Sequence, residues 1–210
     1  MSIPSLPAGY DVTKRVGSGR SDCHITVGFD REGTHIPRFL VLLHYQVSTD
    51  PLQWDAIARM DHNETAALGH DIYQEGLHVD IARRNESTVH VEISDNALPS
   101  IRGIVIRGCT DYLEENTQYF IDVFEGDQSA ANPPKWPDGG ESPHTLISTK
   151  HVNTGMSKEQ SREDPSEEVI SMDELTEILA EAEGVTPEEI EQGAEELDLA
   201  PPEEATVLNE

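Results

Sequence analysis

The sequence predicts an α+β fold in which a mostly antiparallel sheet is covered by one long helix and followed by a disordered linker and a short acidic helical hairpin. Three observations lead to this fold class. Apolar and polar residues alternate in four segments before residue 95, as in strands with one buried face. After Pro99 the apolar spacing changes to three and four residues, the period of a helix. The last 48 residues are far more acidic than the rest.

The strands of the predicted sheet differ in how clearly they are marked. The first alternating segment runs from Cys23 to Phe29. Residues 36–47 are apolar almost throughout, which predicts a central strand. The segment 54–60 also alternates, but its spacing fits a helix as well.

The two alternating segments between residues 77 and 93 form the clearest hairpin. If the apolar residues of both strands lie on one face, the two residue numbers of each cross-strand pair must sum to 170. This register places Asp80 opposite His90 and His78 opposite Glu92 on the outer face. Both pairs are compatible in charge, so we expect them to hold the register.

A helix is predicted to follow the sheet. Apolar residues recur at helical spacing from Ile101 to Val123, and this stripe can cover the sheet. The helix is expected to end near Gly126. Gly103 and Gly108 weaken it locally but permit close packing on the strands.

The C-terminal part has a linker and two short helices. Residues 127–166 are rich in Pro, Gly, Ser and Asn, which is typical of a linker. Capping boxes begin at Ser171 and Thr186, and Gly184 ends the first helix. Two helices of this size are too short to bury a core alone, so their apolar faces need the body, a second copy or another protein. The predicted division is an N-terminal arm at 1–20, an α+β body at 21–126, a flexible linker at 127–166, an acidic two-helix tail at 167–200 and a disordered C-terminus at 201–210.

The charge of the chain limits its partners. The formal net charge is -27, and residues 163–210 contain 18 acidic residues and no Lys or Arg. Because the body is acidic too, we expect a protein of a salt-accumulating microbe, where molar salt screens the repulsion. Such a surface disfavours nonspecific nucleic-acid binding. The start has no apolar core of signal-peptide length and no segment approaches a membrane span, which predicts a cytoplasmic protein without membrane contact.

None of the polar motifs identifies a particular function. Cys23 and Cys109 lie far apart among apolar neighbours, so we expect buried free thiols, no zinc spacing and neither a metal site nor a cofactor. The densest titratable stretch lies between Asp61 and His78, where imidazoles and carboxylates could act as acid, base or metal ligands. No nucleophile motif and no phosphate-binding glycine loop are present.

Two resemblances concern the body. The runs RFLVLLHYQV and QWDAIARMDHNETAALGHDIYQEGLHVDI resemble uncharacterised conserved proteins of halophilic archaea over residues 20–125, which implies a small α+β domain of unknown function. The order of a Trp-bearing strand, an Arg-x-Asp turn and spaced histidines is similar to TumE-type toxin proteins. Met60 and His62 depart from that pattern, which has an aromatic residue and Asn there. The matching positions are Arg59, Asp61, His70 and His78.

Two functions are therefore predicted from different classes. The first is a non-enzymatic interaction or regulatory protein, whose C-terminal helices bind a protein partner through Leu175, Ile178, Leu179, Ile190 and Leu197. The alternative is a toxin-like RNA-directed protein. Its catalytic residues would be His70, Asp71 and His78 with Asp61 and Arg59, and its phosphate-binding residues Arg83, Arg84, Arg102 and Arg107. A small-ligand or metal-binding domain remains a third possibility, and the oligomeric state is left open.

Overall fold

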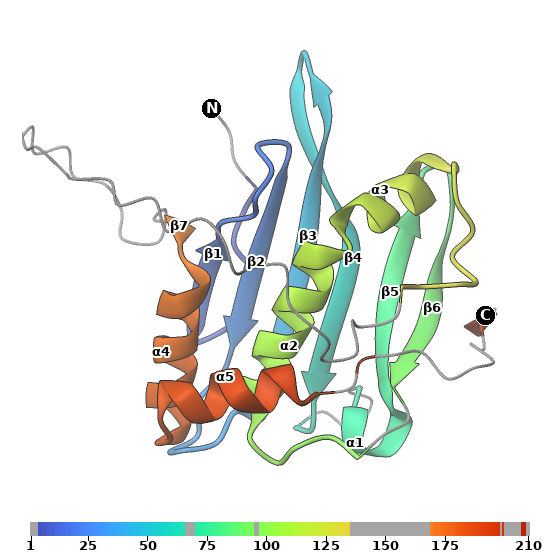
Figure 1. The fold of residues 1–210 in the computed structure, drawn as a ribbon. Coiled ribbons are helices and arrows are strands. Elements are labelled where there is room, and N and C mark those ends of the chain that lie inside the picture. Colours follow the sequence, from blue (N-terminus) through green and yellow to red (C-terminus); the bar gives the residue numbers. More distant parts are fainter. Residues whose placement is uncertain are drawn as a thin grey trace, which may run out of the picture.

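The computed structural model describes residues 4–65, 70–94, 97–134, 169–197 and 199, together with the backbone of 207–208. Most of the predicted linker and C-terminus lies outside the described residues. The described strands form one sheet, and α2 to α5 lie on one of its faces (Figure 1). The strands are β1 (Val12–Val16), β2 (Cys23–Phe29), β3 (Arg38–Thr49), β4 (Leu52–Asn63), β5 (Leu77–Arg83), β6 (Glu86–Ser94), β7 (Val169–Ile170) and β8 (Val207–Leu208). The helices are α1 (Ile72–Glu75), α2 (Arg102–Glu115), α3 (Thr117–Glu125), α4 (Met172–Glu183) and α5 (Pro187–Glu195).

The sheet has the strand order β7-β1-β2-β3-β4-β5-β6-β8. All neighbouring strands are antiparallel except β7, which pairs with β1 in parallel. The mixed α+β class and the mostly antiparallel sheet are therefore confirmed. The ambiguous segment 54–60 belongs to a strand, because β4 is paired on both sides, with β3 and with β5.

The predicted hairpin register is confirmed. Asp80 pairs with His90 and His78 pairs with Glu92. Since neighbours along a strand point to opposite faces, these four side chains share the face of the sheet that lies away from the helices. Their positions determine the candidate site described below.

The core lies between the sheet and the helices. Side chains on the helix face of the central strands are fully buried, and α2 packs over β2 and β3 while α3 packs over β4 and β5. This arrangement buries the apolar set of each alternating segment, as the sequence pattern requires. The strand residues with no exposed surface include Ile25, Phe39, Val41, Leu43, Met60, Val79, Ile81, Val91 and Ile93.

The prediction of one long helix over the sheet is wrong, because the helix is interrupted at Asn116. This residue has φ -101° and ψ 16°, outside the helical region. Its side-chain amide donates to the carbonyl of Tyr112 at 2.8 Å, and the Thr117 hydroxyl donates to the carbonyl of Leu113 at 2.9 Å. Such side chains compete with the backbone for helical carbonyls. The chain therefore continues as α3 in a new direction, toward β5 (Figure 1).

The C-terminal helices pack on the body. Both α4 and α5 contact α2, and α4 also contacts β1. Both predicted capping boxes and the end at Gly184 are present. The close packing expected at Gly103 is with these helices rather than with strands, because a Cβ there would lie 2.8 Å from Ile190 Cδ1 and 3.2 Å from Leu179 Cβ. The core of the body thus extends into residues 170–199.

The other face of the sheet is called the open face here. The N-terminal arm crosses part of it, where a Cβ on Gly28 would lie 3.0 Å from Tyr10 Cγ and 3.2 Å from Pro7 Cβ. The guanidinium of Arg15 donates to the carbonyl of Pro4 at 2.6 Å and holds the arm in place. Among the helices of the described ranges, none has the length and apolar character needed to cross a bilayer.

Candidate functional site

A polar group of side chains occupies the open face over β4, β5 and β6. The backbone register aligns Arg59 with Asp80, and Asp80 with His90, so that these three residues form one row across the strands. Two residues further along β5 and β6 lie His78 and Glu92, which are also paired. Directly paired residues have Cβ atoms about 4.5–5.5 Å apart, close enough for their side chains to meet.

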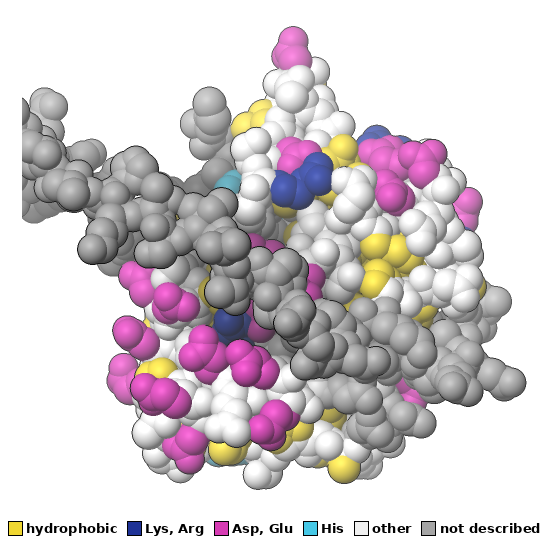
Figure 2. All heavy atoms as spheres, viewed as in Figure 1, with side chains coloured by type: hydrophobic (Ala, Val, Ile, Leu, Met, Phe, Trp, Pro, Cys, Tyr) yellow, Lys and Arg dark blue, Asp and Glu magenta, His cyan; other side chains and the backbone are white. Residues whose placement is uncertain are grey.

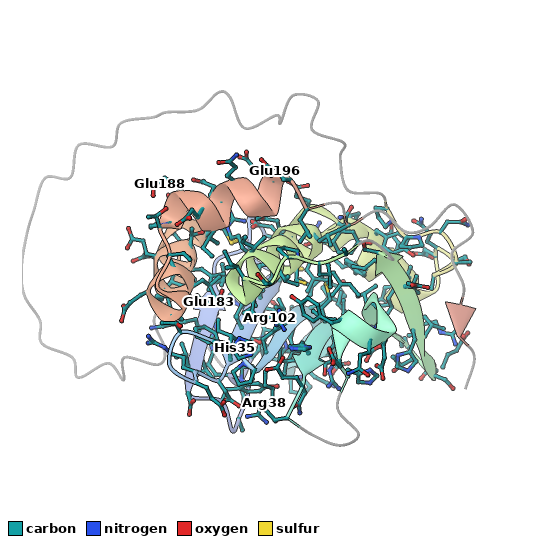
Figure 3. The ribbon with its side chains drawn as sticks, turned by 90° about the horizontal axis from the view of Figure 1, so that it is seen from below. His35, Arg38, Arg102, Glu183, Glu188 and Glu196 are labelled. Atoms are coloured by element: carbon teal, nitrogen blue, oxygen red, sulfur yellow. The ribbon has the colours of Figure 1, made fainter. Side chains whose placement is uncertain are left out.

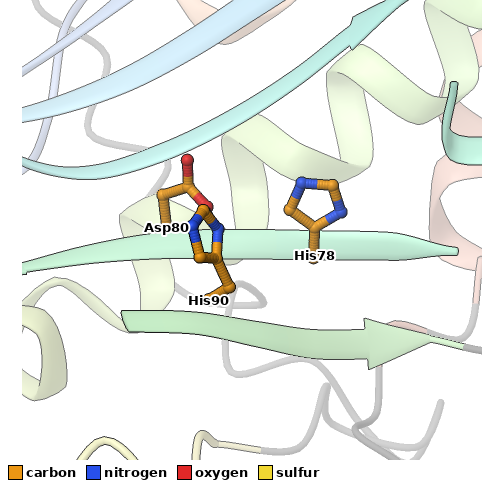
Figure 4. A group of neighbouring side chains, drawn as sticks. All are labelled: His78, Asp80 and His90. Atoms are coloured by element: carbon orange, nitrogen blue, oxygen red, sulfur yellow. The ribbon is translucent and has the colours of Figure 1, made fainter. Parts of the chain in front are cut away.

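Three of these residues bring metal-ligating atoms together. One ligand atom each of His78, Asp80 and His90 lies within 4.8 Å of the others, and all three residues are half-buried. Figure 4 shows Asp80 and His90 side by side, with His78 further along β5. Asp80 Oδ1 contacts His90 Nδ1 directly. No other group of three such residues was found in the part of the chain that the structure describes.

A backbone carbonyl fixes the tautomer of the neutral His78 ring. Its Nδ1 lies 3.3 Å from the carbonyl oxygen of Gly76, so Nδ1 carries the proton and donates it. This leaves a lone pair on Nε2, which is buried and has no hydrogen-bond partner among the described residues. Metal-bound histidines characteristically donate their second ring nitrogen to a carbonyl or carboxylate in this way.

The carboxylate of Asp80 is paired with its cross-strand neighbour. Its Oδ1 is buried and forms an ion pair with His90 Nδ1. Buried polar atoms are normally hydrogen-bonded, and those that are not call for an explanation. Here the unsatisfied atom is His78 Nε2, which lies in the same small group as the Asp80–His90 pair.

His70 and Glu92 flank this group. The rings of His70 and His78 are 4.8 Å apart, and His70 Nδ1 lies 3.1 Å from Glu75 Oε2. The carboxylate of Glu92 is directed toward Gly76, where a Cβ would lie 3.0 Å from Glu92 Oε1. Gly76 has φ +81°, so both the backbone and the nearby carboxylate favour glycine there.

Arg59 keeps its positive charge beside these residues. Although burial opposes the charge, the carboxylates of Asp61 and Asp80 hold the pKa of Arg59 above its ordinary value. Its guanidinium donates to Asp61 at 2.8 Å, and about half of the side chain (49%) is exposed. The open face therefore presents imidazoles, carboxylates and one accessible guanidinium together.

Some, but not all, of the predicted catalytic residues lie together in the structure. It brings Arg59, Asp61, His70 and His78 to the same region of the sheet. The Asp71 side chain makes a different contact, because it caps α1 by accepting from Tyr73 N at 3.0 Å. The prediction also missed Asp80 and His90 as site residues. Their signal was present in the hairpin register, where they were interpreted as a structural pair.

The four arginines of the predicted phosphate site do not share one location. Two lie at the β5–β6 turn and two on α2. Each is paired with a different acidic residue, so they do not form a common anion site. The pairs are Arg83 with Glu86, Arg84 with Glu125, Arg102 with Glu64, and Arg107 with Asp111.

The predicted partner-binding residues have contacts within the chain. Four of them, Leu175, Leu179, Ile190 and Leu197, are no more than 7% exposed, and Ile178 is partly buried. The surface that they cover lies largely on α2, which is part of the body. The body is one of the three partner surfaces that the sequence left open. On the face seen in Figure 2, acidic side chains gather over α4 and α5.

A second polar cluster joins α4 to the start of α2 (Figure 3). Glu183 accepts from the backbone N–H of Arg102 at 2.9 Å and also from that of Gly103. Burial raises the pKa of Glu183. The Arg102 guanidinium reaches Glu64 at 3.2 Å, and Glu64 also binds His35 at 2.5 Å. Glu183 accepts from the N-terminus of α2, and Glu64 pairs with both Arg102 and His35, so we assign the cluster a structural role.

Comparison with known proteins gives a family but no activity. The family model described as "Domain of unknown function (DUF7718)" matches residues 10–130, more than half of the chain. No curated protein and no solved structure matches. The match supports a domain of unknown function over the body and carries no information about a halophilic source or TumE-type toxins. The chain belongs to the DUF7718 family, whose domain supplies the whole candidate site on the open face.

Proposed function

We propose that the protein binds one divalent transition-metal ion on its open face through His78, Asp80 and His90. The observation that supports this is the convergence of His78 Nε2, a buried atom without a hydrogen-bond partner in the described ranges, with the ion pair of Asp80 and His90. Leaving such an atom unsatisfied costs about 1–3 kcal/mol. A cation bound among the three residues would satisfy it.

The ligand types indicate which metals would bind. Two imidazoles with one carboxylate suit Zn²⁺, Ni²⁺, Co²⁺ or Fe²⁺, whereas Ca²⁺ and Mg²⁺ require mainly oxygen ligands. Both histidines and the aspartate come from one rigid hairpin, so little chain entropy is lost on binding. We therefore expect Zn²⁺ and Co²⁺ to bind and Ca²⁺ not to compete.

A titration tests the proposal directly. Tag-free full-length protein is titrated with Zn²⁺ against a chromophoric chelator, and one ion per chain is expected. His78→Gln, Asp80→Asn and His90→Gln should each weaken binding about tenfold or more. His24→Gln is the matched control, because His24 lies on a different part of the sheet, against Trp54.

The result can contradict the proposal in two ways. Wild-type protein without a stoichiometric zinc ion would refute it. Folded variants at His78, Asp80 and His90 that bind zinc as tightly as His24→Gln would also refute it. Circular dichroism of each variant establishes that it is folded, and the three independent substitutions protect the test against failure of any one of them.

Protein docking by the C-terminal helices remains a prediction of a different class. Because Leu175, Leu179 and Ile190 are buried within the chain, a partner that uses them must replace α2 as their contact. The expected result is a partner lost on deletion of residues 167–210 in a pull-down from concentrated-salt extract. We do not extend the proposal to RNA, since no described contact unites the four arginines.

A further inference from the structure

We infer, on the basis of the proposed metal site, that the bound ion also takes a small oxyanion group, a phosphate or a carboxylate, which Arg59 helps to hold. The inference concerns the ligand of the site rather than the metal. It depends on three features of the open face: the number of protein ligands, the direction of Glu92, and the position of Arg59 in the row.

Among the residues that the structure describes, three ligands meet at this position. Zinc with three protein ligands keeps a coordination position for water or substrate, whereas structural sites have four protein ligands. The nearest further carboxylate on β6, Glu92, points toward Gly76, and the absence of a Cβ on Gly76 gives it space there. His70 is directed to Glu75 through its Nδ1. The arrangement thus favours an external ligand.

Arg59 lies where it can contact such a ligand. It is the direct cross-strand neighbour of Asp80, on the side opposite His90, and its side chain is about half exposed (49%). One of its amino groups donates to Asp61 at 2.8 Å. A guanidinium has five N–H donors, so further donors remain for a bidentate contact with an oxyanion.

The charges near the ion also favour an anion. A divalent ion adds two positive charges beside that of Arg59, and the carboxylates of Asp80 and Asp61 offset two of the three. The carboxylate of Glu92 is directed toward Gly76. An oxyanion bridging the ion and the guanidinium would be held by both, as in other phosphate sites that combine a metal with arginine.

A spectroscopic titration tests this inference. Full-length protein with one equivalent of Co²⁺ is monitored by its visible absorption while inorganic phosphate or acetate is added. We expect a saturable spectral change with at least one of the two anions. Arg59→Gln should raise the half-saturating anion concentration about tenfold or more. Arg59→Lys should raise it less, because Lys keeps the positive charge but cannot make the bidentate contact of a guanidinium. Arg83→Gln, at the far end of β5, is the matched control and should behave as wild type.

The outcomes separate the two proposals. If Co²⁺ does not bind, the metal site fails and the inference fails with it. If Co²⁺ binds but neither anion changes the spectrum, or Arg59→Gln behaves as Arg83→Gln does, the inference is overturned while the metal site stands. If Glu92→Gln weakens Co²⁺ binding about tenfold or more, Glu92 is the fourth ligand and the site is closed to an anion.

Discussion

Replacing Leu179 tests whether the C-terminal helices belong to the core of the free protein. This side chain has no exposed surface, and its Cβ packs against Gly103 of α2. Truncation to Ala removes three carbons, which costs about 2.4 kcal/mol of transfer free energy at about 0.8 kcal/mol per CH₂. A residual cavity adds to this, giving about 3–4 kcal/mol. For a chain of this size, such a loss lowers the melting temperature by roughly 6–16 °C.

Differential scanning calorimetry of Leu179→Ala measures this change. Glu177→Ala on the same helix is the control, because Glu177 is exposed and surface substitutions usually change stability by less than about 0.5 kcal/mol. Identical melting temperatures for Leu179→Ala, Glu177→Ala and wild type would refute the packing of α4 on α2. They would favour instead a tail that stands apart from the body.

Three further predictions concern packing, pH and salt. Gly103→Ala should lose about 1–3 kcal/mol in urea denaturation despite its better helix propensity, since its Cβ would lie 2.8 Å from Ile190 Cδ1; a gain in stability would contradict the close packing. Burial lowers the pKa of His44 from 6.5 to about 4, so the folded state binds fewer protons and about 3 kcal/mol of stability is lost as the pH falls from 6.5 to 4. His44→Gln should reduce this loss in denaturation curves at the two pH values, and an equal loss would contradict it. With a net charge of -27, cooperative unfolding should be lost in dilute buffer and restored in molar KCl, and a sharp calorimetric transition in dilute buffer would oppose salt adaptation.

Local pattern predicted those parts of the fold that depend on nearby residues. The alternation on either side of the β5–β6 turn determined the pairing of Asp80 with His90, because a shift by one residue would reverse both faces. The two capping boxes determined where α4 and α5 begin. The break at Asn116 was missed because the apolar spacing continues through it, whereas its cause is side-chain competition for backbone carbonyls.

Contacts between elements that are far apart in the sequence were less predictable than local structure. An amphipathic stripe shows that Leu175 and Leu179 need a partner surface, but not that α2 provides it. Within the candidate site, the sequence grouped His70 with Asp71 because they are adjacent in the chain, yet they make different contacts. The group of His78, Asp80 and His90 depends on pairing between two strands. Only side-chain positions show that His78 Nε2 has no hydrogen-bond partner within the described ranges.

The most direct test of the metal site is its location in a crystal. Crystals of the full chain grown with one equivalent of zinc would be measured at the zinc absorption edge. We expect the strongest anomalous peak among His78, Asp80 and His90, with ligand distances of about 2.0–2.2 Å. A strongest peak at other residues, or none near this hairpin, would contradict it.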